Sequence, residues 1–146
     1  MKDKTKIYKT AFLSSRTISS ASVLKCYDWA TEMSEQGRCV VSGFHSKLEK
    51  DVLHFLLKGR QKVILVMGRA PYKILPQALV EPLKEGRLEI IYNSELPRQT
   101  KESAYERNKK IIEMADEVVF ASLSPESSLY SLYEEAVRDG KKIIKL

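Results

Sequence analysis

The sequence is poor in cysteine, glycine and proline, and it contains no long apolar run. Its two cysteines, Cys26 and Cys39, are too few for a disulfide framework and lack metal-ligand spacing, so we expect a reducing, cytoplasmic environment. Six glycines and five prolines argue against a disordered or linker-rich chain. No stretch approaches the roughly 18 to 20 apolar residues of a membrane helix, and no apolar signal core follows the basic N-terminus. We therefore expect no export signal and no membrane partner.

The length and charge of the chain set broad limits on its function. A chain of 146 residues has room for one domain with a hydrophobic core. Hydrophobic residues make up 43% and charged residues 30%, which is typical of a globular protein. The net charge of +6, from 25 Lys and Arg against 19 Asp and Glu, favours anionic partners such as phosphates or nucleic acid. The charge alone does not decide between these partners.

Short apolar runs alternate with amphipathic stretches along the chain. We predict strands at residues 7–13, 39–41, 62–67, 88–92, 117–121 and 142–145. Between them we predict helices at residues 19–36, 47–58, 77–85, 101–114 and 128–138. The strand runs are continuously apolar, as is typical of central strands buried on both faces. The pattern predicts the α/β class: a Rossmann-like three-layer sandwich with a mostly parallel, doubly wound sheet of about six strands.

Ligands of such sheets bind outside the carboxyl ends of the strands, so the segments that leave those ends are the candidate site. Helix N-termini at this edge offer free N–H groups to an anion. Serine hydroxyls add donors there and arginines add charge, although each serine taken alone is better explained as a helix cap. The phosphate-binding residues predicted on this basis are Ser14, Ser15, Arg16, Ser42, Gly43, His45, Gly68, Arg69, Ser127 and Ser128.

Several signatures of nucleotide chemistry are absent from the sequence. There is no GxGxxG after the first predicted strand and no GxxxxGK[ST], which argues against a standard dinucleotide site and a P-loop. There is no GxSxG elbow and no pair of histidines at metal spacing. His45 stands in a strand-end loop, where ligand contacts are common, whereas His54 is predicted on a helix surface. We predict no catalytic residue, no metal and no cofactor.

Short stretches of the sequence follow the motif order of a known family. They are residues 11–16 (AFLSSR), 40–43 (VVSG), 63–68 (VILVMG), 94–97 (SELP), 107–109 (RNK) and 118–121 (VVFA). From about Thr10 to its end, the chain resembles the Rossmann-like domain of the DNA-processing protein A family (DprA, also called Smf). This resemblance implies non-enzymatic binding of single-stranded DNA in a basic pocket.

The resemblance adds Arg107 and Asn108 to the predicted site, near the start of a helix. A guanidinium there would bind a phosphate or stack on a base. The alternative for Arg107 is a structural role, paired with Glu95 or with a helix-end carbonyl. Lys109 and Lys110 add positive potential or form a solvated helix face. The candidates for stacking on bases are the aromatic side chains of Phe44, Tyr72 and Tyr105.

The sequence also departs from the family pattern. Ser14 replaces the first glycine of a GSR motif, and residues 127–129 (SSL) replace a Ser-Gly-Ser turn. The family's helical and winged-helix companion domains have no room in 146 residues, so we expect one Rossmann-like DprA/Smf-type domain over residues 1–146.

Two other functions remain open at this point. One is a sensor of a small nucleotide-derived ligand, and the other is an enzyme resembling the phosphoribohydrolases that cleave a base from ribose phosphate. The glycines of their PGGxGTxxE motif are absent from residues 124–135, where Glu134 or Glu135 falls near the position of the motif's carboxylate. Their absence argues against hydrolysis. The sequence leaves open whether the protein forms a homodimer.

Overall fold

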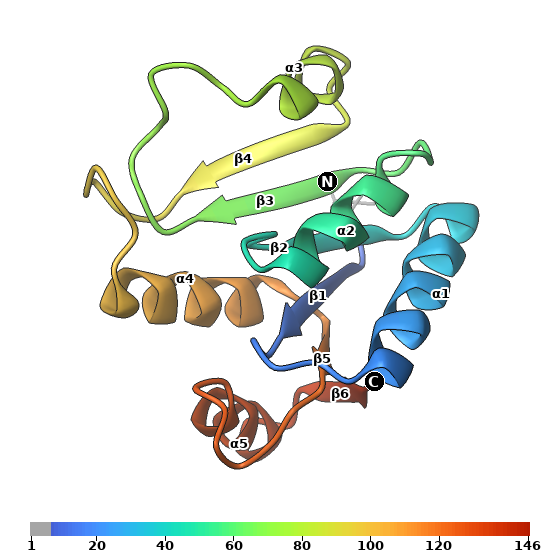
Figure 1. The fold of residues 1–146 in the computed structure, drawn as a ribbon, viewed down its shortest axis with the longest axis vertical. Helices are drawn as coiled ribbons and strands as arrows, with labels where there is room; N and C mark the ends of the chain where they lie inside the picture. Colours follow the sequence, from blue (N-terminus) through green and yellow to red (C-terminus); the bar gives the residue numbers. More distant parts are fainter. Residues whose placement is uncertain (1–6) are drawn as a thin grey trace, which may run out of the picture.

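The computed structural model describes residues 7–146 (Figure 1). The basic segment 1–6, in which we read no export signal, lies outside the described residues. None of the described helices combines the length and apolar composition needed to cross a bilayer. The elements in chain order are β1 (Lys9–Ser14), α1 (Ser20–Gln36), β2 (Cys39–Ser42), α2 (Lys47–Leu56), β3 (Val63–Met67), α3 (Gln77–Lys84), β4 (Leu88–Tyr92), α4 (Lys101–Met114), β5 (Glu117–Ala121), α5 (Tyr130–Arg138) and β6 (Lys142–Lys145).

The six strands form one sheet in the order β4-β3-β2-β1-β5-β6. Every neighbouring pair is parallel, so all carboxyl ends lie along the same edge. Strands β1 to β4 follow one another outward in one direction, and the chain then crosses back through α4 to place β5 on the other side of β1. This reversal makes the carboxyl ends of β1 and β5 the switch point of the sheet.

Apolar side chains bury both faces of the sheet, because the central strands are continuously hydrophobic. On one face, Phe12 and Val40 pack with buried residues of α1, α2 and α3. On the other face, Leu13 and Val41 pack with buried residues of α4 and α5. Figure 1 shows these helices on the two sides of the sheet. The predicted three-layer α/β sandwich is therefore confirmed, with a sheet that is parallel throughout.

Polar side chains cap the starts of α1 and α2. Ser19 caps α1 by accepting the Ser22 N–H, as its position before the helical pattern predicts. A reciprocal capping box opens α2, in which the Ser46 hydroxyl and the Glu49 carboxylate each accept a backbone N–H at the other's position. The predicted boundaries agree with the observed ones to within about two residues. The largest differences are β1 and α5, which both begin two residues later than predicted, and α2, which ends two residues earlier.

Helix α4 lies close to the sheet at its carboxyl edge. Its buried residues include Ser103, Arg107 and Ile111, spaced four apart on one face of the helix. Gly68, directly after β3, allows this approach, because a Cβ built there would stand 2.9 Å from the Ser103 carbonyl oxygen. The polar first half of α4 is thereby held against the loops that follow β2 and β3.

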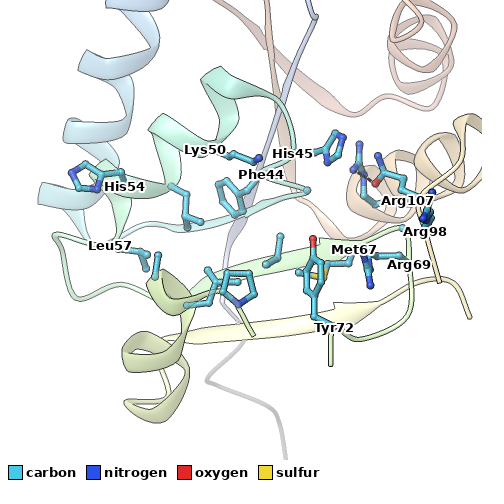
Figure 2. A pocket seen from close by; sticks show the side chains of 18 residues that line it. Phe44, His45, Lys50, His54, Leu57, Met67, Arg69, Tyr72, Arg98 and Arg107 are labelled. Carbon is cyan, nitrogen blue, oxygen red and sulfur yellow. Dashed lines mark hydrogen bonds between the residues drawn. The ribbon is translucent and has the colours of Figure 1, made fainter. Parts of the chain in front are cut away.

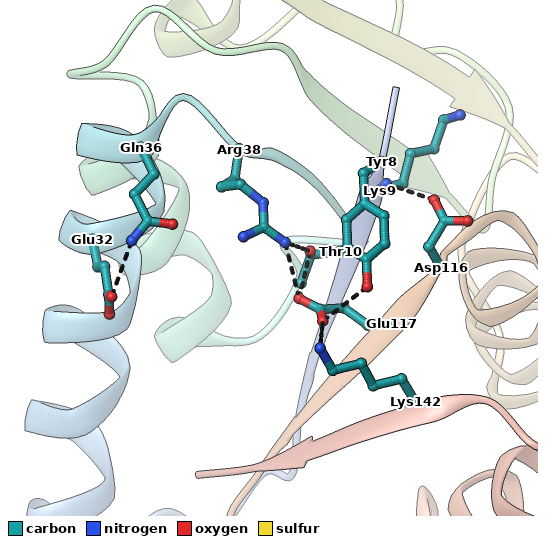
Figure 3. Close-up of polar contacts among 9 residues, drawn as sticks. All are labelled: Tyr8, Lys9, Thr10, Glu32, Gln36, Arg38, Asp116, Glu117 and Lys142. Atoms are coloured by element: carbon teal, nitrogen blue, oxygen red, sulfur yellow. Dashed lines mark hydrogen bonds and ion pairs between the residues drawn. The ribbon is translucent and has the colours of Figure 1, made fainter. Parts of the chain in front are cut away.

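A buried carboxylate joins β5 to its neighbours at the opposite edge of the sheet (Figure 3). Glu117 is 4% exposed, and it accepts hydrogen bonds from the Tyr8 hydroxyl at 3.1 Å and the Thr10 hydroxyl at 2.9 Å. Arg38 and Lys142 form ion pairs with it at 3.3 Å and 3.4 Å. The carboxylate is thus fully paired, and it links β1, β5 and β6.

Replacing Glu117 is expected to destabilise the fold without touching the carboxyl edge. Glu117→Gln should lower the free energy of unfolding by about 1 to 3 kcal/mol, because the amide no longer satisfies the buried Thr10 hydroxyl, the Tyr8 hydroxyl and two cations. The matched control is Glu89→Gln, which removes a half-exposed carboxylate paired with Lys62 at 3.4 Å and should cost less than about 0.5 kcal/mol. Urea denaturation measures both variants, and equal midpoints would show that the Glu117 network contributes little.

Candidate anion-binding site

Two hollows lie along the carboxyl edge of the sheet. We call them the polar hollow, at the β1/β5 switch point, and the apolar hollow, over the ends of β2 and β3. Each has a volume of about 690 Å³, and His45, Gln99 and Arg107 line both of them. These three residues therefore form the partition between two adjoining cavities.

The polar hollow is built from the loops after β1, β2 and β5 and from the start of α4. Its lining is Ser14, Ser15, Arg16, His45, Ser46, Lys47, Glu49, Gln99, Lys101, Ala104, Tyr105, Arg107, Asn108, Ser128 and Leu129. Four cationic side chains and a single carboxylate belong to this set. Hydrogen bonds hold three of its serines, since the Ser15 hydroxyl donates to Ser127 at 2.9 Å and the hydroxyls of Ser14 and Ser46 lie 2.9 Å apart. The hollow combines hydroxyl donors with net positive charge.

The apolar hollow lies between α2, β3 and α3 (Figure 2). Its lining is Gly43, Phe44, His45, Lys50, Leu53, His54, Leu57, Leu65, Met67, Gly68, Arg69, Tyr72, Pro76, Ala78, Leu79, Arg98, Gln99 and Arg107. No Asp or Glu belongs to this lining, which falls entirely within the described residues. Figure 2 shows Arg69, Arg98 and Arg107 gathered at one end of the hollow and Leu57 at the other.

Arg107 is the buried cation of the partition. Its side chain belongs to the interior face of α4 and the residue is only 6% exposed. Its Nη1 donates to the Gln99 amide oxygen at 2.7 Å, and its Nε and Nη2 donate to the Asn108 amide oxygen at 3.2 Å and 3.0 Å. Burial lowers the pKa of Arg107, and the negative charge of Glu49 opposes that effect. The hydrogen bonds to Gln99 and Asn108 use three of the five guanidinium N–H groups. The other two N–H groups remain beside the hollows.

The partners of Arg107 are neutral, which is unusual for a buried cation. Within residues 7–146, it forms no ion pair with Glu95 or with any other carboxylate. Gly43 lies directly against it, because a Cβ built on Gly43 would stand 2.7 Å from Nε. Buried charges are normally paired with an opposite charge, whereas the hydrogen bonds of Arg107 within the described residues go to amide oxygens.

Glu49 occupies the backbone donors at the start of α2. Its carboxylate accepts the N–H groups of His45 at 2.8 Å, Ser46 at 3.2 Å and Ser14 at 3.0 Å, and it is 4% exposed. The loops after β1 and β2 are thereby tied to one another. The carboxylate of Glu49 therefore places a buried negative charge next to the N-terminus of α2.

His45 lies at the junction of the two hollows. Burial lowers the pKa of its imidazole, the positive charge of Arg107 lowers it further, and Glu49 raises it. Lys50 and Arg16 add smaller lowering effects. The ring is therefore neutral at pH 7 and sits inside a cluster of positive charge.

The structure distributes the predicted site residues over both hollows. The polar hollow takes Ser14, Ser15, Arg16, His45, Arg107, Asn108 and Ser128, and the apolar hollow takes Gly43, His45, Gly68, Arg69 and Arg107. Ser42 and Ser127 line neither hollow. Ser42 is fully buried and its hydroxyl accepts the Phe44 N–H. The Ser127 hydroxyl accepts a hydrogen bond from Ser15. Arg107 lies in the second turn of α4, not at its start as the motif suggested, because α4 begins at Lys101.

The aromatic candidates also lie at the hollows. Phe44 and Tyr72 line the apolar hollow, and Tyr105 lines the polar hollow. The Arg69 guanidinium stacks on the Tyr72 ring at 3.8 Å. Phe44 has a left-handed backbone, with φ of 43°, in the loop between β2 and α2. Such a conformation is strained for an aromatic residue and tends to occur at binding sites.

Sequence reasoning missed several lining residues. Gln99 and Arg98 come from the loop after β4, which the sequence shows only as polar and containing a proline. Lys50 and the apolar residues of α2 follow an ordinary amphipathic pattern. Only Glu49 left a signal, the Ser-x-x-Glu spacing of a capping box. Glu134 and Glu135, considered for hydrolysis, line neither hollow.

The molecule is thus an open, doubly wound parallel sheet with a basic double hollow at its switch-point edge. No protein-family profile and no curated protein sequence matches it. Solved structures do match, and they include DNA processing protein A from Helicobacter pylori, with a TM-score of 0.74 at 20% identity. DNA processing protein A from Streptococcus pneumoniae has the same TM-score at 19% identity. The molybdenum cofactor binding protein from Rippkaea orientalis gives 0.68 at 10% identity.

These similarities establish a DprA-like Rossmann fold. The alignments cover 94%, 95% and 97% of this chain, in the order given above. The chain spans 64% and 50% of the two DNA processing protein A chains and 77% of the molybdenum cofactor binding protein. At identities of 20% or less the likeness concerns the fold alone.

Removing the charge of Arg107 is expected to leave the fold intact. Arg107→Met should change the free energy of unfolding by no more than about 1 kcal/mol, or raise it, because the buried guanidinium is desolvated without a carboxylate partner. Its acceptors on Gln99 and Asn108 are half-buried and can turn to water. Urea denaturation is the measurement. A loss of about 3 to 5 kcal/mol would instead show that the fold depends on the contacts of the Arg107 guanidinium.

Proposed function

We propose that this protein binds single-stranded nucleic acid, or the phosphate of a nucleotide, at the carboxyl edge of its sheet without catalysing a reaction. The observation that carries the proposal is the buried guanidinium of Arg107 between two hollows, which forms no ion pair within the described residues. A phosphate oxygen is a natural partner for its two remaining N–H groups, because guanidinium and phosphate match in charge and in planar geometry.

The surroundings of Arg107 support a polyanionic ligand. Arg16, Lys47 and Lys101 line the polar hollow, and Lys50, Arg69 and Arg98 line the apolar hollow. Successive phosphates of one strand would find cations on both sides of the partition. The Helicobacter pylori structure that shares this fold concerns single-stranded DNA binding, which agrees with the proposal.

A second candidate is a small ligand, and the apolar hollow is the observation that favours it. Its volume of about 690 Å³ falls in the range of small-molecule pockets. The structural neighbour from Rippkaea orientalis is described as a molybdenum cofactor binding protein. A nucleoside monophosphate that raises the melting temperature while oligonucleotides do not bind would favour this reading.

Binding of a fluorescent oligodeoxynucleotide should depend steeply on salt. We expect a linear fall of log affinity with log salt concentration, because each phosphate contact releases a counterion. Arg107→Met should weaken binding at low salt by at least about tenfold, since a charge-assisted bidentate contact is lost. Fluorescence anisotropy titrations measure both effects.

The matched control for that titration is Arg138→Met. Arg138 is exposed in the last turn of α5 and lines neither hollow, so the control removes the same charge away from the site. Equal weakening in the two variants would show that only overall charge matters. Undetectable binding of oligonucleotides by the unchanged protein at low salt would overturn the proposal.

Oligonucleotide binding should also strengthen at acidic pH. A phosphate beside His45 opposes the lowering of its pKa by burial and by Arg107, so binding takes up a proton. Affinity should therefore rise as the pH falls below about 6.5, the ordinary pKa of histidine. Phosphodiesters do not titrate in this range, and His45→Gln should flatten the profile. Identical pH profiles in both proteins would remove His45 from the site.

A further inference from the structure

We propose that the apolar hollow is a pocket for one flat heteroaromatic ring of the ligand, whose phosphate lies on Arg107. This inference rests on the proposed function and adds to it a requirement for a base. It predicts that the protein distinguishes a strand with bases from a bare sugar–phosphate chain.

The walls of the hollow are suited to a ring. Apolar side chains from four segments surround it: Phe44 before α2, Leu53 on α2, Leu65 and Met67 on β3, and Leu79 on α3. All five are 9% exposed or less, so the walls are fixed by the packed core. A nucleobase placed between them exchanges water for apolar and aromatic contacts, which is favourable for every base.

The three arginines that line the hollow lie at one end of it, while Lys50 lies beside Phe44 along its side. Figure 2 shows Arg69 and Arg98 beside Arg107 at one end, with Phe44 between them and Leu57 at the far end. A ligand that is apolar at one end and anionic at the other therefore has one preferred direction. A ring would point toward α2 and α3, and its phosphate would lie at the partition.

The mouth of the hollow already holds a stacked cation–aromatic pair. The Arg69 guanidinium lies 3.8 Å from the centre of the Tyr72 ring and donates from Nε to the Ala70 carbonyl oxygen at 2.9 Å. Tyr72 is 40% exposed, so its ring is accessible to a ligand. An incoming base can extend this stack, because aromatic faces and guanidinium planes both bind π-systems.

The polar hollow on the other side of Arg107 is suited to different chemistry. Its lining supplies the hydroxyls of Ser14, Ser15 and Ser128 and the charges of Arg16 and Lys101. These groups fit the neighbouring phosphate and sugar of the same strand. The partition thus separates a place for a base from a place for the backbone.

The test compares a short oligodeoxynucleotide with an abasic oligomer of equal length and charge. We expect the abasic oligomer to bind the unchanged protein at least about fivefold more weakly, which is the lower limit for loss of one stacked base. Fluorescence anisotropy at low salt gives both affinities. Equal affinities would contradict the ring pocket but not the proposed function. If neither oligomer binds, both the ring pocket and the proposed function are wrong.

Two alanines allow each hollow to be filled separately. Ala78 is exposed on α3 and lines the apolar hollow, whereas Ala104 on α4 lines only the polar hollow. The preference is the ratio of the affinity for the oligomer with bases to the affinity for the abasic oligomer. In the Ala78→Trp variant this ratio should fall to about one, while the affinity for the abasic oligomer stays unchanged. Ala104→Trp should weaken both oligomers and preserve the preference. A preference that survives Ala78→Trp would overturn the inference, and thermal melts confirm that both variants are folded.

Discussion

The buried charge of Arg107 is the constraint around which the carboxyl edge is built. A guanidinium in the interior demands hydrogen bonds, and the loop before α4 and α4 itself supply them through Gln99 and Asn108. It also demands space, which Gly43 provides by having no side chain. Because these partners are neutral, the positive charge stays available to the two hollows it separates.

The parallel sheet explains why so many unconnected segments meet at this charge. All six strands end at one edge, and the reversal after β4 brings the loop after β5 beside the loop after β1. The Ser15–Ser127 hydrogen bond joins residues that are 112 positions apart in sequence across this switch point. Meanwhile the Glu117 network joins neighbouring strands at the opposite edge through paired charges and hydrogen bonds.

The sequence predicts the elements well because their signals are local. Continuous runs such as residues 63–67 read as buried strands, and Ser19 and Ser46 mark helix starts. The same logic places Arg16, Arg69 and Ser128 at the ligand edge. Local patterns carry no information about which side chains meet across the edge, so they do not predict the partition at Arg107. They also miss the apolar hollow, whose walls look like ordinary core positions on α2 and α3.

Glu49 ties together two of the loops at the carboxyl edge of the sheet. By accepting N–H groups from residues 14, 45 and 46, it holds two loops in one arrangement before any ligand arrives. The loops at this edge are thus ordered by hydrogen bonds within the protein. A buried negative charge holds together an edge at which the other charged side chains lining the two hollows are positive.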